Sequence, residues 1–218
     1  MIATKRIFLS SLMALSLGFA AASSALASDA SAPDLLIRQL SIETLEAVKA
    51  DKAIQAGDMQ RIIALVDAKV MPNINFQRMT SSAVGRFWRQ ATPEQQKRLQ
   101  DEFKTLLVRT YAGALREVKD QSIALKPLRA SPEDTEVVVK TEIRGKGEPI
   151  QLDYRLEKVG AIWRIYDVNV LGIWLADQYR NSFAQEIGAN GIDGLIKSLT
   201  EKNAKAAGNL AAPVKTKG

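Results

Sequence analysis

Histidine and cysteine are both absent from the 218-residue chain. Without histidine there is no Ser-His-Asp triad, no Cys-His pair and no imidazole general base. Without either residue the chain lacks the ordinary ligands for zinc, copper or an iron–sulfur cluster, and it forms no disulfide. No acidic loop has the ligand spacing of a calcium site. We therefore expect no metal cofactor and a fold that is stabilised by packing alone.

The first segment has the pattern of an export signal. A basic pair at 5–6 precedes an uncharged run over 7–22, which is shorter than the roughly 20 residues of a membrane span. Ala25 and Ala27 then place small residues at the usual cleavage-site positions. We predict a signal peptide over 1–27, with a membrane anchor as the alternative, and a location in a bacterial periplasm. Export also argues against nucleic acid as a partner of this weakly basic chain.

Helices are expected to come first in the exported part of the chain. Apolar residues recur at helical spacing in two segments, and a shorter helix is expected in a third: 34–56, 59–70 and 75–84. Thr92-Pro93-Glu94-Gln95 is a strong helix start, with Thr92 as the N-cap and Gln95 closing a capping box. The helix that follows is expected to reach about Val118. Its apolar stripe is broad enough to contact more than one neighbouring element.

Alternation with a period of two follows the helices in four segments: 121–128, 135–144, 149–158 and 161–171. This alternation is typical of an antiparallel sheet covered on one side, and the connections are too short for parallel crossovers. In the fourth segment Trp163 and Ile165 lie on the face opposite to Val168 and Val170. We therefore expect curvature or a bulge in that strand, with apolar side chains on both of its faces.

Two more helices are expected after Gly172, one ending near Ile187 and one beginning near residue 190. Residues 203–218 are rich in alanine, lysine, glycine and asparagine without periodicity, and they are predicted to be a disordered tail. Residues 28–202 are thus expected to form a single α+β domain. In this domain a helical layer packs on a curved four-stranded antiparallel sheet.

Few side chains are candidates for catalysis. Asp153 and Asp167 lie on neighbouring predicted strands and could form the carboxylate pair of an acid–base enzyme. However, Asp153 falls on the polar alternation of its strand, and Asp167 is expected to form a cap or a salt bridge near the end of the sheet. We therefore predict no catalytic residue.

Two other groups of side chains leave alternatives open. Basic residues gather around the capped helix and could bind an anionic head group or a partner, although such runs are usually a solvated face: Arg86, Arg89, Lys97, Arg98 and Arg109. The aromatic residues Phe87-Trp88, Trp163 and Trp174 fit either a solid core or the walls of a cavity between the sheet and the helices. Composition and spacing do not separate these two interpretations.

Three stretches carry motifs of a known family: Asn75–Met79 with Gly85–Gln95; Phe103–Tyr111; and Trp163–Val168 with Gly172, Tyr179–Phe183 and Gly191–Leu195. In this order and spacing they resemble the MlaC, or toluene-tolerance auxiliary, family of periplasmic phospholipid-binding proteins. The resemblance covers about residues 34–202. A departure occurs at Asn73 and Asn75, where the family is expected to favour an aspartate nearby.

The resemblance implies a shuttle that holds a phospholipid with its acyl chains in an apolar cavity and its head group at the surface. Apart from this cargo, it implies no cofactor. It also implies exchange of lipid with an outer-membrane lipoprotein–porin complex and an inner-membrane ABC transporter complex, which maintains the lipid asymmetry of the outer membrane. From facing geometry, we expect the walls of the cavity to be Phe87, Trp88, Phe103, Leu106, Leu107, Tyr111, Val168, Val170, Ile173 and Trp174.

Two alternatives remain at this point. The first is a small hydrolase or isomerase with an apolar pocket in a cone-shaped α+β fold, which would use Asp167 with Tyr166 or Tyr154. The second is a purely structural envelope protein whose interior is filled by its own side chains.

Overall fold

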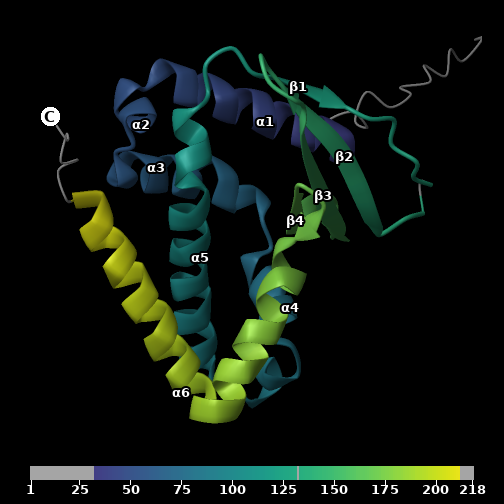
Figure 1. The fold of residues 1–218 in the computed structure, drawn as a ribbon. Coiled ribbons are helices and arrows are strands. Elements are labelled where there is room, and N and C mark those ends of the chain that lie inside the picture. The colour runs from purple at the N-terminus through teal and green to yellow at the C-terminus, as the bar shows by residue number, and fades with distance from the viewer. Residues whose placement is uncertain (1–31, 132, 212–218) are drawn as a thin grey trace, which may run out of the picture.

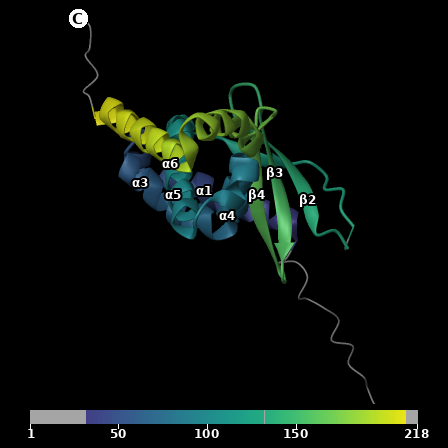
Figure 2. The ribbon, with the colours of Figure 1, turned by 90° about the horizontal axis from the view of Figure 1, so that it is seen from below.

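The computed structural model describes residues 32–131 and 133–211, so the predicted signal peptide over 1–27 lies outside the described part of the chain. Helices gather on one face of an antiparallel sheet, as Figure 1 and Figure 2 show. The order of elements, helices followed by strands and then a long helix, agrees with the sequence prediction. None of the helices in the described ranges is both long and apolar enough to cross a membrane.

The first helical segment is divided in two, whereas the sequence predicted one helix over 34–56. Helix α1 spans Pro33–Ala50 and helix α2 spans Lys52–Ala56. The break occurs at Asp51, because its side chain accepts hydrogen bonds from the backbone N–H groups of Ala53 and Ile54. An aspartate that caps a new helix in this way does not continue the preceding one.

The second segment begins as predicted but changes its helical type before it ends. Helix α3 spans Met59–Leu65, and a π-helical turn and a short 3₁₀ helix follow it, Val66–Val70 and Met71–Asn73. Helix α4 spans Phe76–Val84 and leads into a 3₁₀ helix, Gly85–Gln90. These elements bring the chain to the start of the long central helix.

Helix α5 spans Pro93–Arg116 and begins with the capping box that the sequence predicted. The Gln95 N–H donates to Thr92 Oγ1 at 3.2 Å, and the Thr92 N–H donates to Gln95 Oε1 at 3.0 Å. Two backbone N–H groups at the helix start are thereby satisfied, which fixes where α5 begins.

The sheet contains the four predicted strands and a short fifth one, in the order β1-β2-β3-β4-β5 with every neighbouring pair antiparallel. The strands are β1 Ser122–Leu125, β2 Glu136–Arg144, β3 Ile150–Val159, β4 Ile162–Val170 and β5 Ile173–Trp174. Strands β2, β3 and β4 begin and end within one residue of their predicted limits. The sheet is thus a meander, as the short connections require.

Because of a bulge in β4, the apolar residues of this strand are distributed differently from the prediction. Arg155 of β3 pairs with Asp167, but the next residue, Leu156, pairs with Ile165, so Tyr166 is the extra residue. The extra residue shifts the alternation by one. Ile165 and Val168 therefore both face the helices, where each packs with buried apolar residues. The bulge was predicted correctly, but the expectation of apolar side chains on both faces of β4 was wrong.

Helix α6, Leu175–Ala211, folds back on itself at Gly191, which has φ 71° and ψ −178°. Glycine tolerates this backbone conformation, whereas a residue with a Cβ essentially does not adopt it. Figure 1 shows the two arms of α6 meeting at a sharp angle, with the second arm running beside α5. The two predicted C-terminal helices are therefore these two arms, and the bend lies next to the predicted start of the second helix near residue 190.

The second arm extends into the predicted disordered tail, so the boundary at residue 202 was wrong. Asn203 is buried, and its Nδ2 donates to the backbone oxygen of Glu102 at 3.0 Å and to the Glu102 side chain at 2.7 Å. These bonds hold the arm against α5. The helix continues to Ala211, and residues 212–218 lie outside the described ranges.

Candidate functional site

Buried apolar side chains form three separate clusters within the described residues. One joins α4, the first half of α5 and α6, and is built around Phe103. A second lies between α1 and the sheet, and a third joins α1, α2 and α3 to the second half of α5. Small domains usually have one contiguous core. The division confirms that α5 contacts more than one neighbour.

Apolar side chains where these clusters meet are only partly buried. Ile74 and Val168 pack against both the Phe103 cluster and the sheet cluster, and neither is fully covered. Leu106 and Leu107 of α5 are likewise partly buried, although both pack against the Phe103 cluster. Inward-facing apolar residues that retain accessible surface offer a surface for a bound apolar molecule.

Aromatic side chains pack closely at one end of this interior. The ring of Phe103 is fully buried and lies 5.8 Å from Phe76, 5.1 Å from Tyr179 and 5.3 Å from Phe183, measured between ring centroids. The contacts with Tyr179 and Phe183 are edge-to-face, a favourable geometry for aromatic pairs. Helix α6 thus packs against α5 at Phe103.

Most of the predicted wall residues lie together in this region. Phe103 is a member of the first cluster, and five others pack against it: Phe87, Trp88, Leu106, Leu107 and Val168. Tyr111 lies further along α5 and is partly buried, and burial raises the pKa of its hydroxyl, with a smaller contribution from the charge of Tyr179. Val170 is partly buried at the end of β4.

Ile173 and Trp174 are the predicted wall residues that the structure does not bring to this group. Ile173 is 54% exposed. The Trp174 ring lies under Arg155, whose guanidinium carbon is 3.8 Å from the ring centroid. Both residues follow a tight turn, because Leu171 and Gly172 have φ values of 52° and 91°. The turn directs β5 back along β4, which the sequence analysis did not anticipate.

Four residues of the same interior were absent from the predicted wall. Tyr179 and Phe183 of α6 and Ile74 were not assigned to the site, and Trp163 was interpreted as either core or cavity wall. The signal for the pair on α6 was present, since positions four apart on a helix share a face. Ile74 carried no such signal, because it precedes α4 in an irregular segment.

The carboxylates proposed for an acid–base enzyme have structural partners instead. Asp167 accepts hydrogen bonds from the backbone N–H groups of Val168 at 2.9 Å and Ala176 at 3.1 Å, and it pairs with Arg155 at 3.0 Å. It therefore ties β4 to the start of α6, as the predicted cap and salt bridge require. Asp153 is buried, contrary to its predicted exposure, and it accepts from the Thr141 N–H and the Gln151 side chain.

The tyrosines that could have assisted Asp167 are also engaged elsewhere. The Tyr166 hydroxyl donates to Glu136 at 2.9 Å rather than to Asp167. Tyr154 is buried on the helix-facing side of the sheet, and burial raises its pKa to about 12. This arrangement provides no poised acid–base pair. The described residues also contain no cluster of three or more acidic side chains suited to holding a metal ion.

A model of the MlaC protein family matches residues 38–201, which is well over half of the chain. This chain belongs to the MlaC family. The two names in the sequence-based resemblance, MlaC and toluene tolerance, both recur among its relatives. The family prediction is therefore confirmed.

Two curated relatives in the MlaC family differ in their sequence identity to this chain and in the length of the match. The toluene tolerance protein ttg2D of Pseudomonas putida is 33% identical over 108 residues, which is 50% of this chain and 50% of that protein. The match thus spans about half the length of ttg2D. The intermembrane phospholipid transport system binding protein MlaC of Haemophilus influenzae is 20% identical over 173 residues, which is 78% of this chain and 81% of that protein.

A solved structure with higher identity supports the fold of this MlaC family member. The phospholipid-binding protein of Ralstonia solanacearum, determined in complex with a phospholipid, is 45% identical to this chain. The TM-score is 0.78, and the alignment covers 80% of this chain and 98% of that protein. The likeness confirms the mixed architecture of helices on an antiparallel sheet.

The departure from the expected MlaC pattern at Asn75 has a local explanation. Asn75 caps α4 by accepting from the Arg78 N–H at 3.1 Å, and its Nδ2 donates to Glu157 at 2.7 Å. An aspartate could make the first bond but not the second, because an ionised carboxylate has no proton to donate. Asparagine at this position therefore adds a hydrogen bond between the start of α4 and β3, beside the ion pair of Arg78 with Glu157.

Asp167 and Asp51 should respond to pH in opposite directions. Burial raises the pKa of Asp167, so any stability it adds over asparagine is greatest in acid and declines as pH rises through its native pKa. Hydrogen bonds from Arg61 and the Ile54 N–H lower the pKa of Asp51, so its contribution is lost as pH falls. Urea unfolding of Asp167→Asn and Asp51→Asn from about pH 3 to pH 7 measures both slopes. Parallel slopes for the two variants would contradict this assignment.

Proposed function

We propose that this protein binds a phospholipid and carries it across a bacterial periplasm without catalysing a reaction. The observation that carries the proposal is the 45% identical protein of matching fold that was determined with a phospholipid bound. The partly buried apolar side chains between α5 and the sheet supply a surface of the required kind in this chain. Membership of the MlaC family and the name of the Haemophilus relative support transport rather than storage.

The physical need for a carrier follows from the hydrophobic effect. Burial is worth about 0.8 kcal/mol for each methylene group. An acyl chain of about 16 carbons would therefore cost on the order of 13 kcal/mol to expose to water. A carrier must cover the chain during transit and release it to an acceptor that offers equivalent cover. Such a cycle needs complementary apolar surfaces, and it needs no nucleophile, general base or metal.

The proposed wall comprises the eight predicted residues that lie at or near the Phe103 cluster, together with Ile74, Trp163, Tyr179 and Phe183. Ile173 and Trp174 are left out, because one is exposed and the other is covered by Arg155. We propose that the acyl chains lie between α5 and β4 and that the head group remains at the surface. The donors and acceptors of the lipid would be an outer-membrane lipoprotein–porin complex and an inner-membrane ABC transporter complex.

The test is to purify the protein from the periplasm, extract it with organic solvent and analyse the extract by mass spectrometry. We expect phospholipid in a near-stoichiometric amount. Removal of this lipid should lower the melting temperature, and adding phospholipid back should restore it, because a ligand that binds only the folded state stabilises it. An extract without phospholipid, together with an unchanged melting temperature, would favour the structural alternative with a filled interior.

A further inference from the structure

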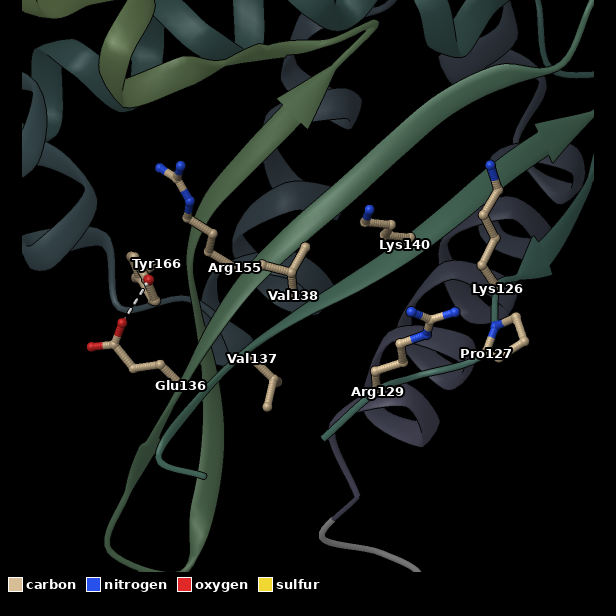
Figure 3. A pocket seen from close by; sticks show the side chains of 9 residues that line it. All are labelled: Lys126, Pro127, Arg129, Glu136, Val137, Val138, Lys140, Arg155 and Tyr166. Carbon is tan, nitrogen blue, oxygen red and sulfur yellow. Dashed lines mark hydrogen bonds between the residues drawn. The ribbon is translucent and has the colours of Figure 1, made fainter. Parts of the chain in front are cut away.

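The outer face of the sheet carries a groove that the proposed lipid site does not use. Its volume is about 730 Å³, and it opens on the side of the sheet away from the helices. Figure 3 shows that the side chains lining the groove come from the segment that follows β1 and from the strands that face this segment. They are Lys126, Pro127, Arg129, Glu136, Val137, Val138, Lys140, Arg155 and Tyr166.

The groove follows a stretch of β2 that has no neighbouring strand on one side. The ladder between β1 and β2 ends where the Lys126 N–H donates to the Lys140 oxygen at 2.9 Å. Pro127 then fixes the backbone, and the chain leaves the sheet. Within the described structure no backbone hydrogen bond joins residues 127–131 to residues 136–139. Half of β2 is therefore an open edge.

Strand geometry determines which backbone groups are free at this edge. In an antiparallel sheet the N–H and C=O groups of alternate residues point to the same neighbour. The backbone groups of Lys140 point toward β1, so the backbone groups of Val138 point to the same side. At Val138 that side is occupied by the groove instead of a strand. The Val138 side chain is 40% exposed on the outer face. Among the described residues, the backbone N–H and C=O groups of Val138 have no strand partner at this edge, and the Val138 side chain offers an apolar contact.

The charge of the groove is positive once the ion pairs are taken into account. Glu136 pairs with Arg78 at 2.7 Å, and Lys126 and Arg155 also have carboxylate partners. Arg129 and Lys140 are exposed, and among the described residues no carboxylate lies within 4.0 Å of either one. These two cations stand on opposite sides of the groove, so a chain lying between them would meet positive charge on both sides.

We propose that the open edge of β2 binds an extended acidic segment of another protein, which adds to the sheet as a strand. Main-chain hydrogen bonds to Val138 would supply affinity, and acidic side chains facing Arg129 and Lys140 would supply specificity. An apolar residue of the segment would cover Val138. The proposal is independent of the proposed phospholipid, since the groove and the interior lie on opposite faces of the sheet.

The test begins with a random octapeptide library displayed on phage and selected on the purified full-length protein. We expect the selected peptides to be enriched in aspartate and glutamate relative to the input. Their affinity should fall about tenfold in the R129E/K140E variant and should weaken with added salt. The matched control is K197E/K202E, which changes net charge equally on exposed positions of α6 and should leave affinity within about twofold.

A second measurement separates strand addition from attraction between charges. Two versions of one selected peptide are made, with backbone N-methyl groups on alternate residues in either the odd or the even positions. A strand uses only one of these sets, so one version should bind as before and the other should lose binding. The Val138 amide should also exchange its hydrogen more slowly in the complex. The proposal would be overturned if the selected peptides were not enriched in acidic residues, or if both methylated versions bound equally. Arg129 and Lys140 would then be explained as charges that protect an edge strand from pairing.

Discussion

Replacing Leu107 with tryptophan is expected to remove most of the phospholipid that we propose copurifies with the protein. Leu107 is partly buried on α5 beside the Phe103 cluster, where the proposed acyl chains lie. The larger ring would displace about three methylene groups of lipid. At about 0.8 kcal/mol each, this costs about 2 kcal/mol of binding free energy, which is more than tenfold in affinity. Mass spectrometry of the extracted lipid, normalised to protein, measures the change.

The same substitution also tests whether the interior is hollow. In a filled core the added ring would cost about 1–3 kcal/mol of stability. In an open interior the lipid-free variant should unfold at nearly the same urea concentration as the lipid-free parent. The control is Leu115→Trp, two helical turns further along α5, where the leucine packs against the third cluster. This control should retain its lipid. If Leu107→Trp destabilises the protein and retains the lipid, the position is part of a solid core.

Replacing Phe103 with alanine is expected to lower the free energy of unfolding by about 3–5 kcal/mol. The Phe103 ring is fully buried and contacts the rings of Phe76, Tyr179 and Phe183, so its removal leaves a cavity among side chains that cannot easily close. Native domains are typically stable by about 5–15 kcal/mol, so the loss is a large share of the total. Urea unfolding of lipid-free protein, followed by tryptophan fluorescence, measures it.

A conservative variant separates packing from a specific aromatic effect. Phe103→Leu fills most of the volume and should lose much less stability than Phe103→Ala, although it also loses the edge-to-face contacts. Measurements on lipid-free protein keep ligand stabilisation out of the comparison. A loss below about 1 kcal/mol in Phe103→Ala would show that the cluster rearranges to fill the space, contrary to the close packing of the four rings.

The parts of the fold that the sequence predicted well are those where local chemistry decides the outcome. Thr92 and Gln95 define the start of α5 by bonds between neighbouring residues, and alternation with a period of two located β2 and β3. The bulge was signalled by apolar residues that changed face within β4. In each case the decisive interaction lies within a few residues of the signal, so no knowledge of the tertiary structure was needed.

The parts that failed depend on partners far along the chain or on competing local choices. Asn203 belongs to an ordered helix because it bonds to Glu102, about a hundred residues earlier, and composition alone indicated a tail. Asp51 could continue a helix or cap a new one, and periodicity did not distinguish these. Trp174 has the size and polarity of a wall residue, but a turn and the Arg155 side chain place it on the other side of the sheet.

The packing of the second arm of α6 against α5 depends on the backbone conformation of one residue, Gly191. A straight α6 of 37 residues would be about 55 Å long and would carry Leu195, Ile196 and Leu199 away from α5 into solvent. The backbone angles of Gly191 instead turn the chain so that these side chains become fully covered. A residue with a Cβ at this position would strain the backbone by about 1–3 kcal/mol. The bend in the carboxyl-terminal region thus lies at a residue that has no Cβ.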